Sequence, residues 1–568
     1  MKTYTCKNIR NIALAGHGGS GKTSVAEGLL YKCGEIERMG KVSDGNSVCD
    51  YDPEEIKRTV SISAAIAPYE WNGSKINIID APGGFDFYGE VAEAMALADS
   101  ALIVVGAVSG PVVGVEKSMA LCKKANKPRM MVINQMDREN ANFDKVVDAL
   151  VDKFGPSVVP IQLPIVEGGA FKGYVDVTTM TAKLFDAKGD KETAIPANLS
   201  DRASQFREAL TEAAAESDEK FFENGELSQE DLMSGLCKGV LDGGLTPICC
   251  CAAQPNIGVK TLMDNLVHYM PTAAEAPMRA AVDAKTGEAV TVDPNGKFSA
   301  QVMKTVADPF VGKISLMRIF SGSLSNTVAP YNANSEKLEK PGTIYMMRGK
   351  NLITVDKLEA GDIGAMAKLQ FTNTGDTLCD QSAPVKFESI DFPKPCIFLA
   401  VTAKKQGEDD KIISGLNRLK EEDPTITIEK NAETGDVLIC GTGETHIGVI
   451  CAKLLNKFKV EAQLSDPHVA YRETIRSTAE AEGKHKKQSG GAGQFGVVQM
   501  RFEPMPEGDF EFVNAIVGGV VPKEFIPAVD AGIQGALQSG VIAGFPVVDV
   551  KVTLYDGSYH EVDSSEMA

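Results

Sequence analysis

The sequence has 568 residues, of which 43% are hydrophobic and 24% charged, and its formal net charge is −19. A chain of this length divides into several domains, because single hydrophobic cores stop growing near ~250–300 residues. No apolar run reaches the ~20 residues of a membrane span, no signal-peptide core is present, and the acidic balance argues against a general nucleic-acid binder coated with basic residues. We therefore expect a cytoplasmic protein without a membrane segment.

Apolar strands alternate with amphipathic helices from residue 8 to about residue 150. Strands are expected at 12–15, 76–79, 101–105 and 130–134, and helices at 91–97 and 115–124. This alternation predicts a mostly parallel sheet covered by helices on both faces. Ligands of such sheets bind at the carboxyl ends of the strands, and three sequence motifs fall there.

A glycine-rich loop follows the first strand and precedes a helix. It matches the pattern G-x-x-x-x-G-K-[ST] with residues Gly16, His17, Gly18, Gly19, Ser20, Gly21, Lys22 and Thr23. Backbone N–H groups of such a loop converge on phosphate oxygens, while Lys22 would reach the β- and γ-phosphates and the Thr23 hydroxyl would hold Mg²⁺. The alternative is a glycine-rich turn without a ligand, which the complete pattern in this context disfavours. The loop indicates a nucleoside triphosphate but not its base.

The second motif, Asp-Ala-Pro-Gly at 80–83, ends another strand. Asp80 can bind Mg²⁺ through water, and the backbone N–H of Gly83 can approach the γ-phosphate. The same residue types also form simple turns, so this motif is weaker on its own.

The third motif is Asn134-Gln135-Met136-Asp137, again at a strand end. The Asp137 carboxylate can accept two hydrogen bonds from guanine that adenine cannot supply, and a buried polar mismatch costs about 1–3 kcal/mol. We therefore expect guanine as the base, with Asn134 and Gln135 completing its site. Ala252 and Ala253, at the end of a strand that begins at Thr246, are weaker candidates for backbone contact with the base.

These motifs resemble those of P-loop GTPases, and the chain resembles the elongation factor G family of translational GTPases from end to end, most closely its divergent second paralogues. The segment NQMDREN at 134–140 is close to the family's NKMDREN, and DYDPEEIKRTVSI at 50–62 corresponds to the family's switch I. Ser61 stands there in place of the Mg²⁺-binding Thr and keeps the hydroxyl. The resemblance implies GTP and Mg²⁺ as ligands, with the metal on Thr23, Ser61 and Asp80.

The resemblance also implies a multidomain α/β fold. We expect a P-loop GTPase domain at 1–275 with an inserted subdomain at about 157–245, a β-barrel at 283–390, an α+β domain at 395–468, and an α+β fourth domain at 469–568 that is C-terminally incomplete, with the family's fifth domain absent. Short strands and turn signals over 298–379 are also typical of a β-barrel. The insert is expected to hold a strand at 173–178 and a helix at 201–222. The third domain is expected to hold a helix at 410–421 and a second one opening at 441–446.

The fourth domain contains a glycine loop at 488–496 that follows three lysines, and a second turn segment at 556–560. Glycines beside lysines can bring backbone close to RNA phosphate. A glycine hairpin with an exposed histidine is the alternative. By resemblance, Gly490, Gly491, Gln494 and His560 would contact RNA near the tRNA–mRNA duplex.

The sequence differs from the family's pattern at residues of the nucleotide motifs and of the fourth-domain loop. Gly84 replaces the family's catalytic His, Gly19 an acidic P-loop residue, Gln135 the Lys of N-K-x-D, and Thr59 the Gly of switch I, while Ala492 replaces an Arg of the fourth-domain loop. Because glycine cannot position water, Gly84 should slow hydrolysis by roughly 10²–10⁴-fold unless another group substitutes. No residue is therefore assigned as catalytic.

The sequence thus predicts a monomeric, ribosome-associated factor that couples GTP hydrolysis to translocation-like movement, contacting rRNA, ribosomal proteins, tRNA and mRNA. Two alternatives remain open. One is a GTP-binding regulator that hydrolyses slowly or not at all, which Gly84 favours, and the other is a ribosome protection or recycling factor.

Overall fold

The computed structural model describes residues 2–185, 190–215, 228–308, 311–488, 490, 493–506 and 508–568. Two compact units make up the chain. One comprises residues 1–430 and 437–466, and the other comprises residues 431–436 and 467–568.

A seven-stranded sheet forms the centre of the N-terminal domain, with the strand order β2-β3-β1-β4-β5-β11-β6. Its strands are β1 (Ile9–Ala15), β2 (Ala65–Trp71), β3 (Ser74–Asp80), β4 (Ser100–Gly106), β5 (Arg129–Asn134), β6 (Val158–Pro160) and β11 (Thr246–Cys250). The central strands are buried along their whole length because helices cover both faces, as is usual for parallel sheets. The predicted parallel sheet is confirmed, except that β2 pairs with β3 as an antiparallel edge hairpin.

The helices around this sheet are α1 (Lys22–Lys32), α2 (Pro53–Arg58), α3 (Tyr88–Leu97), α4 (Val113–Lys124), α5 (Phe143–Phe154), α8 (Gln229–Leu241) and α9 (Val259–Tyr269). Short 3₁₀ helices are η1 (Cys6–Asn8), η2 (Val42–Asp44) and η3 (Phe85–Phe87). The helix α5 shows how the sequence codes for such an element: Asn142 caps its first turn through Lys145 N–H, and Gly155 ends it.

The insert between β6 and β11 forms a separate four-stranded sheet with the order β10-β9-β8-β7. Its elements are β7 (Gln162–Glu167), β8 (Ala170–Asp176), β9 (Thr181–Leu184), β10 (Lys191–Thr193), η4 (Ala197–Leu199) and α6 (Ser200–Ala215). The strand expected at 173–178 overlaps the second half of β8, which ends at Asp176. The expected helix at 201–222 corresponds to α6, and its residues 216–222 lie outside the described part of the chain.

The second domain is an eight-stranded antiparallel sheet with the order β18-β17-β23-β14-β15-β22-β19-β20. Its strands are β14 (Ser299–Asp308), β15 (Gly312–Ser321), β17 (Tyr331–Asn332), β18 (Lys337–Leu338), β19 (Ile344–Arg348), β20 (Asn351–Val355), β22 (Ile363–Ala367) and β23 (Thr377–Cys379). Smaller pairings involve β12 (Ala281–Asp283), β13 (Ala289–Val290), β16 (Ser323–Ser325), β21 (Lys357–Glu359) and β24 (Val385–Phe387).

Buried ion pairs join this second domain to the GTPase domain. Lys75 of β3 donates to both carboxylate oxygens of Asp362 at 2.7 Å. Arg318 of β15 pairs with Asp99 at 2.7 Å and donates to the Leu97 carbonyl at 3.0 Å. These charged side chains are almost fully buried, so the loss of either partner would leave an uncompensated charge in the interior. The ion pairs therefore favour one particular docking of the two domains.

A third buried cation, Lys304 of β14, lies between two carboxylates of α3. Its amine donates to Glu93 Oε2 at 3.1 Å and also forms an ion pair with Glu90. The Oε2 oxygen of Glu90, which contacts the Lys304 amine, also accepts a hydrogen bond from the backbone N–H of Ala64 at 2.6 Å. Ala64 directly precedes β2. Burial alone would lower the pKa of the Lys304 amine, but the two carboxylates raise it above its ordinary value. Lys304 therefore ties the second domain to α3 and, through Glu90, to the start of β2.

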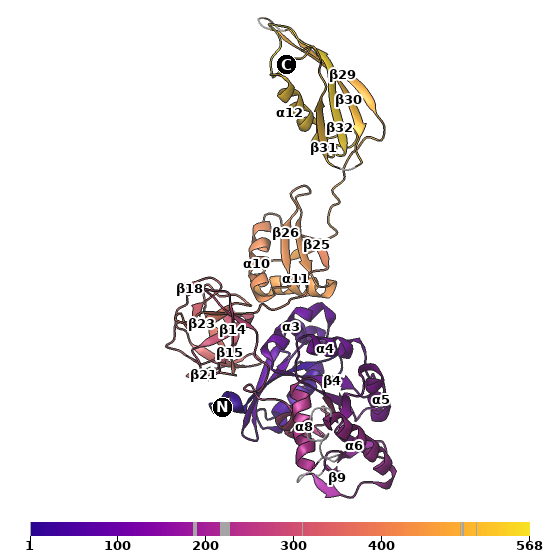
Figure 1. The fold of residues 1–568 in the computed structure, drawn as a ribbon, viewed down its shortest axis with the longest axis vertical. Helices are drawn as coiled ribbons and strands as arrows, with labels where there is room; N and C mark the ends of the chain where they lie inside the picture. The colour runs from indigo at the N-terminus through magenta and orange to yellow at the C-terminus, as the bar shows by residue number, and fades with distance from the viewer. Residues whose placement is uncertain are drawn as a thin grey trace. The chain divides into compact units, whose positions relative to one another are not determined.

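The third domain is a four-stranded antiparallel sheet with two helices beside it (Figure 1). Its elements are β25 (Ile397–Ala403), α10 (Asp409–Glu422), β26 (Thr427–Lys430), β27 (Val437–Gly441), α11 (Glu444–Phe458) and β28 (Ala462–Ser465). Helix α11 begins at Glu444, later than the expected opening at 441, because Gly443 is still extended with φ −178° and ψ 168°.

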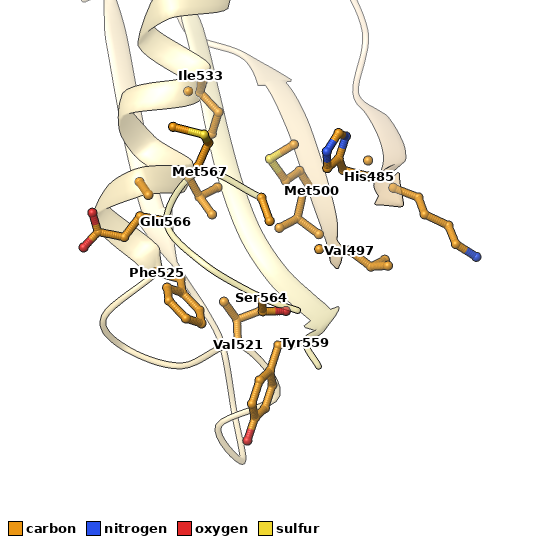
Figure 2. Close-up of a pocket in the computed structure, with 18 of the residues that line it drawn as sticks. His485, Val497, Met500, Val521, Phe525, Ile533, Tyr559, Ser564, Glu566 and Met567 are labelled. Carbon is orange, nitrogen blue, oxygen red and sulfur yellow. The ribbon is translucent and has the colours of Figure 1, made fainter. Parts of the chain in front are cut away.

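The second unit has the strand order β29-β30-β32-β31 with helix α12 beside the sheet (Figure 1). Its elements are β29 (Ala479–Lys487), β30 (Gln494–Pro504), β31 (Phe510–Asn514), α12 (Ile526–Leu537) and β32 (Val550–Ser558). Between α12, the sheet and the last residues of the chain lies a mainly apolar pocket of about 600 Å³. Figure 2 shows Met500, Ile533 and Met567 around it, with His485 at its edge. Across the described residues, no helix is long and apolar enough to span a membrane.

Candidate nucleotide-binding site

The glycine loop lies between β1 and α1 and has the backbone that the motif predicts. Gly16, Gly19 and Gly21 adopt φ values of 136°, 81° and 89°, in the left-handed region that favours glycine. A Cβ on Gly16 would lie 2.5 Å from the Val104 carbonyl oxygen, and one on Gly21 would lie 2.4 Å from Asn134 Nδ2. Sterics therefore require glycine at both positions.

Hydrogen bonds within the glycine loop hold the Lys22 side chain in place. The Lys22 amine donates to the carbonyls of Gly16 and His17 at 3.1 and 3.0 Å, and the Ser20 hydroxyl donates to the His17 carbonyl at 3.0 Å. Gly18 and Gly19 are exposed, so the loop amides face a space that phosphate oxygens can enter.

Switch I brings a second hydroxyl to the loop. The Thr23 and Ser61 hydroxyl oxygens are 3.1 Å apart, and Asp80, at the end of β3, is 1% exposed. Within the described residues, no hydrogen bond of ordinary geometry reaches either carboxylate oxygen of Asp80, although the Thr23 hydroxyl is near enough to lower the pKa of this carboxylate. Burial and the nearby carboxylate of Asp50 raise the pKa of Asp80 to about 7. Two hydroxyls and a buried carboxylate fit Mg²⁺, which prefers oxygen ligands and retains several waters.

The described residues contain no group of three or more His, Cys, Asp and Glu side chains that could hold a metal. The predicted Mg²⁺ ligands include only one such side chain, and Mg²⁺ usually takes one or two carboxylates and completes its shell with phosphate and water, so they stay a prediction.

The short helix α2 fixes the course of switch I. Asp52 accepts from the Glu54 N–H at 2.8 Å, and Glu55 accepts from the Asp52 N–H at 2.9 Å, forming a capping box. The other oxygen of Glu55 accepts from the N–H groups of residues 62 and 63 at 3.0 and 2.9 Å, which ties the far end of the segment back to α2. Thr59 ends α2 with φ 54° and ψ 37°, a left-handed conformation that is strained for a β-branched residue.

The Asp-Ala-Pro-Gly segment lies directly against the glycine loop. A Cβ on Gly83 would be 2.5 Å from Lys22 Nζ and 2.6 Å from Gly18 N, so only glycine permits this approach. Gly84 has an extended backbone with φ −79° and ψ 138°, and a Cβ there would meet the Phe87 ring at 3.3 Å. Position 84 can therefore carry a side chain if Phe87 moves slightly.

Contacts join η3, directly after Gly84, to the third domain. The carboxylate of Asp86 accepts from the Thr445 N–H at 3.1 Å, and the Asp86 carbonyl accepts from the Thr442 hydroxyl. Phe87 packs with Ile62 and Val449 in a small buried cluster. The start of α11 is thus in contact with residues next to the phosphate site.

The third motif joins the predicted base site to the glycine loop. Asn134 Nδ2 donates to the Ser20 carbonyl and Gln135 Nε2 to the Gly19 carbonyl, at 3.0 and 2.9 Å. Gln135 has φ 67°, which turns the chain so that Asp137 is exposed at the edge of the sheet. The Gln135 amide thus joins this motif to the glycine loop, and its part in the guanine site stays a prediction.

Ala252 and Ala253 follow β11 and lie beside Asn134. The N–H of Ala253 donates to Asn134 Oδ1 at 3.0 Å, and the N–H of Ala252 donates to the Ile257 carbonyl at 2.9 Å. Both alanines are fully buried. Their N–H groups stabilise the loop that holds Asn134, and their backbone contact with the base stays a prediction.

Models of known families match the chain in four successive segments. Residues 7–272 match the elongation factor Tu GTP binding domain, 297–381 match elongation factor G domain 2, 392–466 match elongation factor G domain III, and 467–568 match elongation factor G domain IV. A protein of Thermus thermophilus with a known crystal structure is 34% identical, and the alignment covers 99% of this chain and 83% of that one with a TM-score of 0.86. This chain belongs to the elongation factor G family of translational GTPases.

Membership of this family confirms the resemblance and the predicted fold class. The family's GTP-binding domain implies that the site described above takes a guanine nucleotide. Gly84, which by resemblance replaces the family's catalytic His, lies between the loop-facing Gly83 and the contacts of η3 with the third domain.

Two turn segments meet in the family's fourth domain. The Gly493 N–H donates to Asp563 at 2.8 Å, and the Ser564 hydroxyl donates to the Phe495 carbonyl at 2.6 Å. His560 is exposed, and its Nδ1 accepts from the N–H groups of residues 562 and 563 at 3.3 and 3.2 Å. Neutral His560 thus carries its proton on Nε2, which can donate to a phosphate or a ribose hydroxyl.

The other predicted RNA-contact residues belong to the glycine loop of the same domain. Gly490 is exposed, Gln494 Oε1 lies 3.0 Å from His485 Nε2, and Gly491 is outside the described residues. The mainly apolar pocket of the same unit (Figure 2) also has Lys484 and His485 in its lining.

Proposed function

We propose that this protein is a GTP-binding, ribosome-associated translation factor that couples GTP hydrolysis to translocation-like movement. The observation that supports this most strongly is the convergence of the glycine loop, Asp80–Gly83 and Asn134–Asp137 in one site, within a chain that matches elongation factor G domains through domain IV. We further propose that it acts as a cytoplasmic monomer, with rRNA and ribosomal proteins as partners and with tRNA and mRNA near the fourth domain.

In this proposal the loop amides and Lys22 hold the β- and γ-phosphates. Thr23, Ser61 and Asp80 hold Mg²⁺, which when bound would neutralise charge on the phosphate oxygens. Asp137 selects guanine by accepting hydrogen bonds from the N1–H and N2–H₂ groups. Asn134 fixes the position of the base site relative to the glycine loop through its hydrogen bond to the Ser20 carbonyl.

Release of the γ-phosphate would free Gly83 from its position against the glycine loop. The neighbouring Asp86 and Phe87 contact Thr442 and Val449 of the third domain, so a rearrangement of this segment would reach α11 directly. Order-to-disorder changes of switch segments on loss of the γ-phosphate are a general means of moving domains.

The test is single-turnover GTP hydrolysis by the whole protein, with and without ribosomes, together with a translocation assay on pre-translocation ribosomes. We expect GTP binding, stimulation of hydrolysis by ribosomes, and GTP-dependent translocation. Absence of hydrolysis at saturating ribosome concentration would refute the enzymatic part, and absence of ribosome binding in the GTP state would refute the translation role.

Gly84 favours a second candidate, a slow-hydrolysing GTP-dependent regulator that occupies the ribosome. Glycine offers no group to orient the attacking water, and the loss of such a group typically slows hydrolysis by about 10²–10⁴-fold. Tight GTP-dependent ribosome binding without turnover would support this candidate over the first.

A further inference from the structure

A turn of the second domain touches the chain on both sides of switch I. Gly349 and Lys350 form the two-residue turn between β19 and β20. The N–H of Gly349 donates to the carbonyl of Ile66 in β2 at 2.8 Å, and a Cβ on Gly349 would lie 2.0 Å from the carbonyl oxygen of Val48. Val48 precedes switch I and Ile66 follows it. One buried glycine of the second domain therefore holds the two ends of this segment next to each other.

The contact between Gly349 and Val48 requires glycine. Gly349 has a φ of 51°, in the left-handed region, and any side chain there would collide with the Val48 backbone. Val48 is also held from its other side, because its N–H donates to the buried carboxylate of Glu27 in α1 at 2.6 Å. The second oxygen of Glu27 accepts from the Gly40 N–H at 2.9 Å. The entry to switch I is thus fixed between α1 and the turn of the second domain.

Two further contacts anchor this turn to the GTPase domain. Arg348 Nη2 lies 2.6 Å from Oε2 of Glu35, shortly after the end of α1, and the two side chains are 15% and 26% exposed. Solvent therefore screens this ion pair less than a fully exposed pair. Met347 of β19 is buried in the same hydrophobic core as Ile66. The turn is consequently held by charge and by apolar packing as well as by the contacts of Gly349.

We infer that Gly349 is a positioning residue for switch I, through which the second domain keeps the two ends of the segment together and Ser61 beside Thr23. A loop whose ends are held has less conformational freedom to gain when it opens. Because switch I is ordered by contacts with the γ-phosphate and Mg²⁺, affinity for GTP depends on Gly349, whereas affinity for GDP does not. This inference rests on the proposed binding of guanine nucleotides.

The test compares the affinities of the whole protein for GDP and for the β,γ-imido analogue of GTP by titration calorimetry with Mg²⁺ present. The methyl group of Gly349→Ala must displace Val48, so we expect affinity for the GTP analogue to fall by about 10-fold. Affinity for GDP should stay within about 2-fold of the wild type, because GDP does not distinguish the two states of switch I. Gly287→Ala is the matched control: its φ of 75° is equally unsuited to alanine, but no atom of the described residues lies within 4 Å of a Cβ there.

Tryptic cleavage of α2 gives a second readout that reports switch I itself. Lys57 and Arg58 are exposed, and cleavage after them tracks the population of the open segment. With the GTP analogue bound, we expect Gly349→Ala to be cut there about 10-fold faster than the wild type. Gly287→Ala should be cut at the wild-type rate. A general loss of stability would instead speed cleavage at sites throughout the chain.

Arg348→Gln supplies a variant that adds no atoms at the turn. It removes the ion pair with Glu35 and should lower affinity for the GTP analogue by about 2- to 5-fold without changing affinity for GDP. Lys357→Gln, which breaks the more exposed pair with Glu359 in the same domain, should leave both affinities unchanged. This pair of variants decides the question if Gly349→Ala does not fold.

Equal losses of affinity for GDP and for the GTP analogue would overturn the inference, as would unchanged affinity for the analogue in folded Gly349→Ala. An unaltered rate of cleavage after Lys57 and Arg58 would also overturn it. Failure of the wild-type protein to bind either nucleotide would refute the proposed function and this inference with it.

Discussion

Replacing Lys304 by methionine tests whether the buried charge cluster holds α3 against the second domain. The side chains of Lys304, Glu90 and Glu93 are 6%, 13% and 2% exposed, so solvent cannot take over the role of the amine. Methionine keeps most of the volume and removes the charge. The variant leaves two carboxylates enclosed next to one another without a cation.

The structure sets the expected size of this effect. Removing one partner of a buried ion pair typically costs about 3–5 kcal/mol, because the remaining charge is uncompensated. Burial already raises the pKa of Glu93 well above its ordinary value, and the loss of Lys304 would raise it further. Proton uptake by one carboxylate then limits the loss, so we expect about 3 kcal/mol at neutral pH, at the lower end of that range.

Urea unfolding followed by tryptophan fluorescence measures this loss. Trp71, the single tryptophan of the chain, lies in β2 of the GTPase domain and donates to Asp264 at 2.8 Å. With a urea slope of about 1–3 kcal/mol/M, the transition should move down by roughly 1–3 M.

Two further variants separate the buried charge from other effects of the substitution. Lys313→Met should cost less than about 1 kcal/mol, because its partner Glu421 is 53% exposed. The triple variant Glu90→Gln, Glu93→Gln, Lys304→Met should regain most of the lost stability. A single Lys304→Met variant as stable as Lys313→Met, or a triple variant no better than the single, would refute the reasoning.

Three other predictions follow from the site. Gly84→His should raise ribosome-stimulated single-turnover hydrolysis by about 10-fold or more, since position 84 is extended and only the Phe87 ring must shift; an unchanged rate would mean that another group already positions the water. Asp137→Asn should lower GTP affinity by more than about 100-fold and favour XTP, because an amide can donate to the O2 of xanthine; competition binding measures this, and retained GTP preference would contradict the role of Asp137. Asp423 is half-buried, which alone would raise its pKa, but hydrogen bonds from His446 and Thr425 lower the pKa to about 2. Its stabilising contribution, about 2 kcal/mol, is present above pH ~4 and lost as the pH falls towards 2, so Asp423→Asn should flatten the acid limb of the thermal stability curve; an unaltered limb would contradict the pairing.

The motifs at strand ends could be predicted because local rules specify them. A glycine loop between a strand and a helix needs left-handed φ values at Gly16 and Gly21, and the sequence supplies glycine there. The parallel strands were equally predictable, since their residues are apolar without alternation. The first and last residues of helices were harder to predict. Gly443 is extended, so α11 begins only at Glu444, and no residue pattern indicates this.

What the sequence could not reveal are contacts between residues far apart in the chain. Lys304 and Glu90 are 214 positions apart, and Asn134 and Ala253 are 119 apart. Such contacts depend on how the domains and loops pack against one another, which local conformational propensity does not determine.

The conformation of Thr59 affects how long switch I stays closed. At φ 54°, where the family has glycine, a β-branched residue pays about 1–2 kcal/mol that glycine avoids. Because every 1.4 kcal/mol changes an equilibrium constant tenfold, this strain shifts the balance of closed and open switch I about 5- to 30-fold towards the open form. The strain at Thr59 therefore favours opening of switch I whenever the contacts that hold this conformation are lost.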